Sequence, residues 1–407
     1  MRRSRVCLAL LFVIELFLTA TPAASVRTRP SVIEIPFALQ GSHVMLRVRV
    51  QNRELSFLLD TGAGQSCLDL STAMELSAAV GAHFRAGGAG AGTIDGARLV
   101  TPMTVDVGVG AGGVRQIVTQ ALDLSGISAA KGQDVDGILG ADFIRRFAFE
   151  INYETSKLIL QDPRDYRYQG SGVTLPLTFR SNFPIVRVNL RVSDAETIPA
   201  DAILDVGAGL AVAVTRGYAE RHDLPRKLQA GDPGPFGRGV GGVAQARLTR
   251  LPALEIGPLA VENPVTSLSM ADAGVMAAGA PFEVNIGNDV LKRFALILNY
   301  SESTVTFEPN KRLRDPFEID MSGLRLITTG APYDRVMVEF VIPGSAAAAA
   351  GIAAGDRLVA VDGVKTGNDL PLAAIRKLFL EEGVTRRLDI ERRGQALTRS
   401  LTTKRIV

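Results

Sequence analysis

The chain has 407 residues, of which 46% are hydrophobic and 21% are charged. This is the composition of a globular protein with a sizeable core, and the length indicates two or three domains. The net charge of +3 arises from interspersed acidic and basic residues without a long basic run, which argues against nucleic acid as a partner. The three histidines, His43, His83 and His222, lie far apart and join no cysteine pair, so we expect no metal site.

Residues 1–24 differ from the rest of the chain. Three arginines among the first five residues precede the apolar run "VCLALLFVIELFLTA" and the small-residue stretch "TPAAS". This order predicts a signal peptide cleaved near Ala23 or Ala24, and hence an exported protein, periplasmic or secreted, with no stable membrane span after cleavage. An uncleaved N-terminal anchor is the alternative. After cleavage Cys67 is the one cysteine left, so no disulfide within the chain is expected to hold the fold together.

The region that follows has the pattern of β structure. Apolar and polar residues alternate in "VMLRVRV", "MTVDVGV", "RVNLRV" and "STVTFEP", as they do in half-buried strands. Gly, Pro and Asn clusters separate these stretches at short intervals. Two short helices are expected at "ADFIRRF" and "NDVLKRF", each with an Asp near its start. The sequence therefore predicts a mainly β fold.

The stretch "FLLDTGAGQSCL", from Phe57 to Leu68, places a carboxylate at the end of an apolar strand. Burying an unpaired carboxylate is costly, so such an acid is usually paired, protonated or functional. Asp60 is therefore the first candidate for a site residue.

The chain then repeats this pattern. "LLDTGAG" (Leu58–Gly64) returns as "ILDVGAG" (Ile203–Gly209), and "ILGADFIRRFAFEINY" returns as "NIGNDVLKRFALILNY". Asp60 and Asp142 are 82 positions apart in the first copy, and Asp205 and Asp289 are 84 apart in the second. Order and spacing that persist in this way predict a duplication, with one β-barrel lobe over residues 31–165 and a second over 170–310.

The duplication suggests a use for the acids. If the copies pack about a two-fold axis, Asp60 and Asp205 can face each other, and carboxylates about 3 Å apart share a proton. One carboxylate can then deprotonate a water while the other protonates a peptide carbonyl, without a covalent intermediate. Gly62 and Gly207 would permit the tight turns that bring the acids together, and the Thr61 hydroxyl could bridge the lobes.

These residues resemble the retropepsin-like aspartic proteases. The resemblance rests on the apolar lead-in to "DTGA" and on Ile138-Leu139-Gly140 about 80 positions later, and it covers most of 31–310. It implies that Asp60 and Asp205 form the catalytic dyad of an aspartic endopeptidase, which needs no cofactor. It also implies two glycine-rich hairpins that cover the substrate as flaps, with the candidate residues Gly90, Gly92, Gly239 and Gly241.

The second copy departs from this family at two places. Val206 stands where the family has Thr or Ser, and Asn285 precedes Ile286-Gly287 where the family prefers an apolar residue. Both changes leave the carboxylates in place but put the efficiency of the dyad in doubt. Two alternatives stay open: a catalytically inactive, protease-like protein that binds peptides or serves as a scaffold, and a site built from the first lobes of two chains.

Residues 320–407 have a different composition. The run "PGSAAAAAGIAAGDRLVAVDG" predicts a short helix, a turn and a strand, "NDLPLAAIRKLFLEEG" predicts an amphipathic helix begun by Asn368 or Asp369 and ended by Gly383, and a hairpin closes the region. This α+β order resembles bacterial PDZ domains, which take an extended peptide as an added strand. The resemblance implies protein or peptide substrates recruited by this domain, a C-terminal peptide as its ligand, and a carboxylate-binding loop at Gly323, Leu324, Arg325 and Leu326. Use in packing or assembly alone is the alternative.

Overall fold

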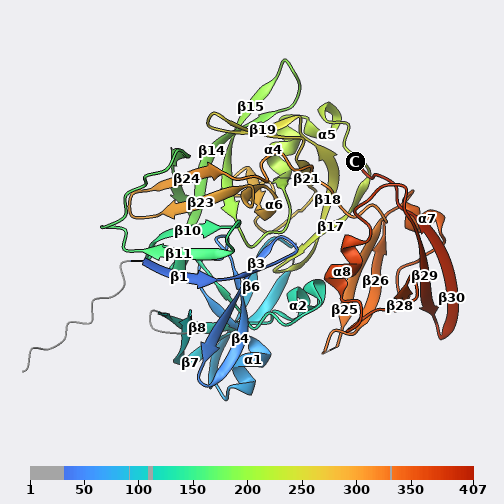
Figure 1. The fold of residues 1–407 in the computed structure, drawn as a ribbon, viewed down its shortest axis with the longest axis horizontal. Helices are drawn as coiled ribbons and strands as arrows, with labels where there is room; N and C mark the ends of the chain where they lie inside the picture. Colours follow the sequence, from blue (N-terminus) through green and yellow to red (C-terminus); the bar gives the residue numbers. More distant parts are fainter. Residues whose placement is uncertain (1–31, 91, 109–112, 331) are drawn as a thin grey trace, which may run out of the picture. The chain divides into compact units, whose positions relative to one another are not determined.

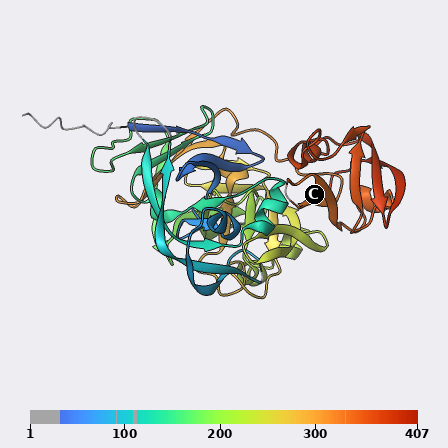
Figure 2. The same cartoon turned by 90° about the horizontal axis from the view of Figure 1, so that it is seen from below.

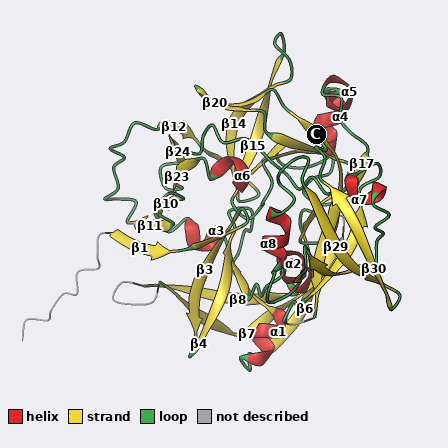
Figure 3. Cartoon of the chain, turned by 45° about the vertical axis from the view of Figure 1, so that its right-hand side comes forward, coloured by secondary structure: helices red, strands yellow, loops and turns green. Residues whose placement is uncertain are grey.

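The structure is a computed structural model, and it describes residues 32–90, 92–108, 113–330 and 332–407. The predicted signal peptide over residues 1–24 lies outside these residues. Strand makes up 49% and helix 11% of the structure, which confirms the predicted mainly β class. Figure 3 shows the same balance, with several strand layers and only short helices. Ser31–Val407 form one compact unit.

The predicted first lobe is built on a sheet of eight strands that come from its own residues. In spatial order they are β2 (Ala38–Gln40), β3 (His43–Val50), β4 (Arg53–Leu59), β9 (Gly137–Leu139), β5 (Cys67–Asp69), β8 (Val114–Leu122), β7 (Thr93–Val107) and β6 (Val80–Gly87). The strands β4 and β9 pair in parallel, and β9 pairs antiparallel with β5.

The predicted second lobe has a sheet of its own, in which the same kind of pairing occurs. In spatial order its strands are β17 (Pro233–Gly239), β18 (Gly242–Arg250), β21 (Val265–Ser269), β16 (Val212–Val214), β22 (Val284–Gly287), β15 (Thr197–Asp205), β14 (Phe183–Arg191), β19 (Ala253–Ile256) and β20 (Leu259–Glu262), with β13 (Thr178–Arg180) beside β14. Here β15 and β22 pair in parallel, and β22 pairs antiparallel with β16.

A third sheet joins the two halves of residues 31–310 (Figure 1). Its strands are β1 (Val32–Pro36), β11 (Lys157–Gln161), β10 (Ala148–Asn152), β23 (Phe294–Asn299), β24 (Thr304–Pro309) and β12 (Val173–Pro176). The junction is the antiparallel pair of β10 with β23, in which Ala148 lies opposite Asn299. One continuous apolar core runs through both halves and this sheet, so neither half buries its core alone.

The C-terminal region has a separate sheet and a separate core (Figure 2, red). Its strands in spatial order are β25 (Leu324–Thr329), β26 (Arg335–Val341), β27 (Arg357–Val361), β29 (Thr385–Arg392) and β30 (Gln395–Thr402), with β28 (Val364–Lys365) beside β27. The predicted order of strand, short helix, strand, helix and closing hairpin is confirmed.

The helices are short. They are α1 (Leu70–Glu75), α2 (Ser125–Lys131), α3 (Ala141–Ile144), α4 (Arg216–Arg221), α5 (Leu224–Lys227), α6 (Asn288–Leu291), α7 (Ala346–Ala349) and α8 (Leu372–Lys377). The two short helices predicted at "ADFIRRF" and "NDVLKRF" are α3 and α6. The predicted cap of α8 is wrong: Pro371 occupies the N-cap, and the helix ends at Leu378, before Gly383. Within the described ranges no helix is long and apolar enough to cross a membrane.

Candidate active site

Asp60 and Asp205 occupy corresponding places at the ends of two central strands. Asp60 follows the last residue of β4, and its backbone N–H donates to the carbonyl of Leu139 in β9 at 2.9 Å. Asp205 is the last residue of β15 and lies opposite Gly287 of the parallel strand β22. Each acid therefore leaves a buried strand at a turn that the adjacent parallel strand supports.

The turn after each acid supplies backbone donors to its carboxyl group. Asp60 Oδ1 accepts from the N–H groups of Gly62 at 2.7 Å and Ala63 at 3.1 Å. Asp205 Oδ1 accepts from the N–H groups of the corresponding residues two and three positions later, both at 3.0 Å. These contacts fix both carboxyl groups and stabilise their ionised forms.

The two carboxyl groups meet between the lobes. A Cβ atom added to Gly62 would lie 3.1 Å from both Asp60 Oδ1 and Asp205 Oδ1. A Cβ atom added to Gly207 would collide with the carboxyl group of Asp60, at 2.7 Å from Oδ2. A side chain at position 207 is therefore excluded, and one at position 62 would crowd both acids, so the two carboxyl groups lie close enough for their charges to interact. Both side chains are half-buried, so they keep some contact with solvent.

Thr61 joins the two turns. Its buried hydroxyl donates to the carbonyl of Leu204 at 2.5 Å and accepts from the N–H of Val206 at 3.0 Å. The second lobe cannot return these bonds, because Val206 is fully buried and has no hydroxyl. The bridge predicted for Thr61 is thus present from one side only.

Asn285 contacts the dyad directly, which the sequence reasoning missed. Its Nδ2 donates to Asp205 Oδ2 at 2.7 Å, while its own Oδ1 is buried without a partner. The corresponding residue of the first lobe is the apolar Ile138, which pairs with Leu58 in the sheet as Asn285 pairs with Ile203. The sequence signal for Asn285 is its departure from the apolar residue that the family prefers at this place.

The two acids have different surroundings, which act differently on their pKa values. Burial and the nearby charge of Asp205 raise the pKa of Asp60 to about 7, against the opposing effect of its two backbone donors. Burial also raises the pKa of Asp205, but there the amide of Asn285 opposes it as well as the backbone. Asp205 thus has a side-chain donor that favours its ionised form, and no such donor contacts Asp60 within the described residues.

The flap candidates lie at the tips of two hairpins. Gly90 and Gly92 lie between β6 and β7, and Gly239 and Gly241 lie at the turn between β17 and β18. The tips touch: the N–H of Gly90 donates to the carbonyl of Val240, and that of Gly92 donates to Gly241, both at 2.9 Å. A Cβ atom on Gly90 would lie 2.5 Å from the carbonyl oxygen of Gly241, so only glycine allows this crossing.

Two further titratable residues lie near the dyad. The ring of His43 packs against the second turn, where a Cβ atom on Gly209 would lie 2.9 Å from Nε2. Burial, followed by the charge of Lys131, holds the pKa of His43 well below its usual range. Burial and the charge of Arg376 lower the pKa of Lys131 to about 7, although the charge of Asp60 opposes this. No sequence signal could have found them, since a turn and a helix end bring them there.

The other repeated acids have structural partners. Asp142 lies in the first turn of α3, where Gly140 is the N-cap, so Asp142 does not cap this helix. Its Oδ1 accepts from both the N–H and the hydroxyl of Ser66, at 2.8 and 2.6 Å. Asp289 likewise follows the cap of α6, and it pairs with Lys292 at 2.7 Å. Cys67 is buried, and burial raises the pKa of its thiol, so it is an unreactive core residue.

The loop proposed to bind a carboxylate precedes and begins β25. The structure places Leu324 and Leu326 in the core of the C-terminal region, at 4% and 3% exposure, while Gly323 adopts a left-handed conformation against Ser345. Arg325 points instead to the second lobe, where its Nε donates to the carbonyl of Pro235 at 2.9 Å.

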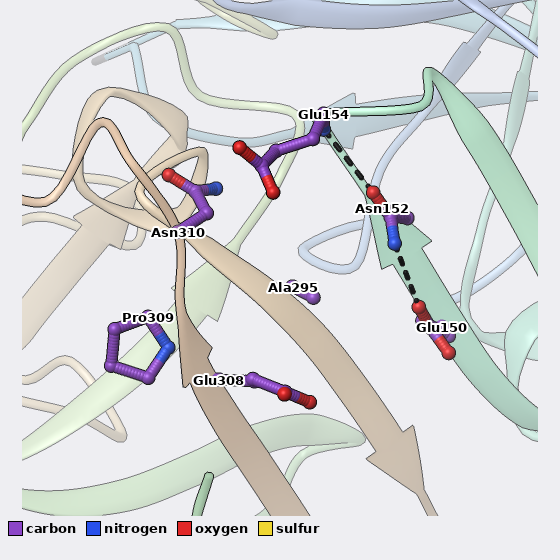
Figure 4. Close-up of a pocket in the computed structure, with 7 residues that line it drawn as sticks. All are labelled: Glu150, Asn152, Glu154, Ala295, Glu308, Pro309 and Asn310. Atoms are coloured by element: carbon purple, nitrogen blue, oxygen red, sulfur yellow. Dashed lines mark hydrogen bonds between the residues drawn. The ribbon is translucent and has the colours of Figure 1, made fainter. Parts of the chain in front are cut away.

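A separate cavity of about 180 Å³ opens on the sheet that joins the lobes (Figure 4). It is lined by Glu150, Asn152, Glu154, Ala295, Glu308, Pro309 and Asn310. Neither acid of the dyad reaches it, and the two hydrogen bonds drawn there fix Asn152 between Glu150 and Glu154. The part of the chain that the structure describes contains no cluster of three or more His, Cys, Asp or Glu side chains suited to a metal ion.

Comparison with known families agrees with this geometry at two places. Residues 46–143 match the family model described as aspartyl protease, and residues 337–392 match the one described as PDZ domain. The first match contains Asp60 but not Asp205, and the second extends from β26 to β29 without β25. No curated protein matches the chain. The chain therefore contains an aspartyl protease domain and a PDZ domain.

Proposed function

We propose that the chain is an aspartic endopeptidase whose catalytic dyad is Asp60 with Asp205. The observation that carries the proposal is that the two carboxyl groups lie close together at two equivalent turns. In each turn, Oδ1 of the acid accepts from two backbone N–H groups. Chance packing of two acids would not reproduce the same donors on both sides. It would also leave two like charges together at a cost, unless they share a proton.

The two acids have different parts in this proposal. Asp205 is ionised, so it accepts a proton from a water held between the carboxyl groups and the scissile carbonyl. Asp60 holds the shared proton below about pH 7 and donates it to the carbonyl oxygen as the tetrahedral intermediate forms. As that intermediate collapses, Asp205 gives the proton it took from water to the leaving nitrogen, and a hydroxyl of the intermediate returns a proton to Asp60. The touching hairpin tips must part to admit a peptide, and closing them again excludes water.

We also propose that residues 31–165 and 170–310 are duplicated lobes. Three features support this: each half has a central parallel pair that ends in the Asp turn, each has a glycine-tipped hairpin, and the joining sheet takes three strands from each half. Residues 320–407 form the PDZ domain in this scheme, supported by a separate apolar core. Peptide or protein substrates recruited through it are part of the proposal.

Cleavage of a peptide library by the purified chain, with and without pepstatin, tests the activity. We expect pepstatin-sensitive products from the parent and none above background from Asp60→Asn. Equal background cleavage by both would replace this function with that of an inactive peptide-binding protein. Activity that survives Asp205→Asn but not Asp60→Asn would place the site between the first lobes of two chains.

Export through the N-terminal segment remains a proposal of the sequence. It predicts that the chain recovered outside the cytoplasm begins near residue 24 or 25, which N-terminal sequencing can measure. A chain that starts at Met1 there would indicate an uncleaved anchor instead.

A further inference from the structure

The C-terminal end of α2, in the first lobe, lies between β25 and α8 of the C-terminal region (Figure 1). The hydroxyl of Thr328 in β25 donates to the carbonyl of Ala129 in α2 at 2.9 Å. A Cβ atom on Gly132, which ends α2, would lie 2.9 Å from Leu372 Cβ in α8 and 3.4 Å from Thr328 Cγ2. The α2 turn of the first lobe therefore contacts both β25 and α8, the two elements between which an added peptide strand would lie.

The outer edge of β25 is already partly occupied by groups of the chain itself. The guanidinium of Arg376 in α8 donates to the carbonyl of Leu326 at 2.8 Å, so that acceptor is already used. Thr328 is also covered, at 1% exposure, although it is polar and lies in an edge strand. A peptide that adds to β25 must first displace the α2 turn.

A second contact holds the flap hairpin of the second lobe. Arg325, also in β25, donates to the carbonyl of Pro235 in β17, and its guanidinium lies over the ring of Phe236, 5.7 Å from the centroid. Arg238, near the tip of the same hairpin, forms an ion pair with Glu339 of β26. The C-terminal region thus restrains the hairpin whose tip bonds to Gly90.

The α2 turn also connects directly to the dyad. Its Ser128 hydroxyl accepts from the N–H of Val135, and β9, which supports Asp60, begins two residues after Val135. Lys131, its last residue, is close enough to Asp60 for that charge to raise the pKa of the ammonium group. Displacing α2 would therefore disturb the chain that leads into β9 and move the cation of Lys131.

We propose that the edge of β25 is a peptide-binding site held closed by the chain's own α2 turn, and that an extended peptide with a free terminal carboxylate opens it and activates hydrolysis. The ligand competes with α2 for Thr328 and with Arg376 for the carbonyl of Leu326. Its binding frees both α2 and the β17–β18 hairpin, so substrate enters the site more readily. The activation part of this inference rests on the proposed function, and the binding part does not.

Binding is tested on the full chain carrying Asp60→Asn, so that the probe is not cleaved. The probe is a decapeptide mixture with four randomised terminal residues and a free carboxylate; its amidated form is the control. Hydrogen exchange should show faster exchange in α2 on adding the free-acid mixture. Thr328→Val, which keeps the shape but removes the bond to Ala129, should tighten binding about 2- to 10-fold. The exposed neighbour Thr329→Val is the matched control and should bind as the parent does.

Activation is tested with a short quenched peptide and otherwise unaltered chains. The free-acid mixture should raise kcat/KM of the parent by about 5-fold or more, the lower end of typical coupling between sites. Glu339→Arg should raise the basal rate and reduce the gain, while adding Arg238→Glu restores the ion pair and the parent behaviour.

The two arms separate this inference from the proposed function. Pepstatin-sensitive cleavage with no response of α2 exchange to the peptide, and with equal affinity in Thr328→Val, would overturn the inference alone. A response of α2 exchange without any cleavage would overturn the proposed activity and leave the closed peptide site standing. No binding by any variant would overturn the inference.

Discussion

The two Asp turns have the same backbone but different neighbours. In the first lobe the residue after the acid, Thr61, bonds twice to the other lobe, and the strand beside it offers the apolar Ile138. In the second lobe the corresponding residues are Val206, which bonds to nothing through its side chain, and Asn285, which donates to the acid. One lobe therefore provides the link between the turns, and the other provides the charge asymmetry.

This difference makes the two acids unequal in their tendency to hold a proton. Equal environments would let either carboxyl group hold the proton. An amide on Asp205 favours its ionised form, so Asp60 keeps the proton. In the proposed mechanism, Asn285 thus gives each acid a separate role. The hydroxyl lost at Val206 costs rigidity, which Thr61 partly maintains alone.

The largest expected effect comes from removing either acid. Asp60→Asn and Asp205→Asn should each lower kcat by ~10²–10⁴-fold, because an amide can neither accept the water proton nor pass on the shared one. Steady-state kinetics on the best library peptide measures this, and circular dichroism confirms that each variant folds. Retained turnover in either variant would show that the dyad is not the site.

The rate should depend on pH through Asp60. Its raised pKa keeps it protonated below about pH 7, so kcat should fall about tenfold per pH unit above that value as the proton is lost. The same shift should make the fold less stable as pH rises from about 4 to 7, because the folded chain holds that proton more tightly than the unfolded one. A rate that rises through pH 7 would reverse the assignment of acid and base.

Thr61→Val should destabilise the molecule. It removes both bonds between the turns and leaves the buried carbonyl of Leu204 and N–H of Val206 without these partners. Each buried group left unpaired costs roughly 1–3 kcal/mol of folding free energy. Urea unfolding measures the loss. If stability is unchanged, the hydroxyl does not link the lobes, and a water must replace it.

Asn285→Ile copies the first lobe into the second. Without the amide the pKa of Asp205 should rise, because a hydrogen bond that stabilises the charged form is lost. The acidic limb of the pH–rate profile should therefore move upward, while the variant loses the unpaired oxygen of Asn285. The matched variant Ile138→Asn should lower the pKa of Asp60 and move the alkaline limb down. Unmoved profiles in both would mean that these side chains do not separate the acids.

The smallest effect is expected for Val206→Thr. A hydroxyl there could return the bond that Thr61 makes, yet the side chain is fully buried and the backbone already supports the turn. Activity should stay within about a factor of two or rise slightly, and stability should change by less than about 1 kcal/mol. A large loss of activity would mean that the site requires the apolar side chain.

The sequence by itself determined the local elements and the pairing of the acids. Alternating strands such as β3 and β24, the short helices α3 and α6, and the glycine hairpins are written in neighbouring residues, because periodicity and turn chemistry act over short distances. The recurrence of the Asp turn at matched spacing was enough to predict that Asp60 and Asp205 lie close together.

Only the tertiary structure decided what surrounds the acids. Asn285 contacts Asp205 from β22, and His43 and Lys131 lie nearby at the start of β3 and the end of α2, so no local pattern indicates them. The start of α8 at Pro371 and the α2 turn against β25 likewise depend on packing. A pKa and a closed peptide edge are set by burial and by non-local contacts, which the folded chain alone supplies.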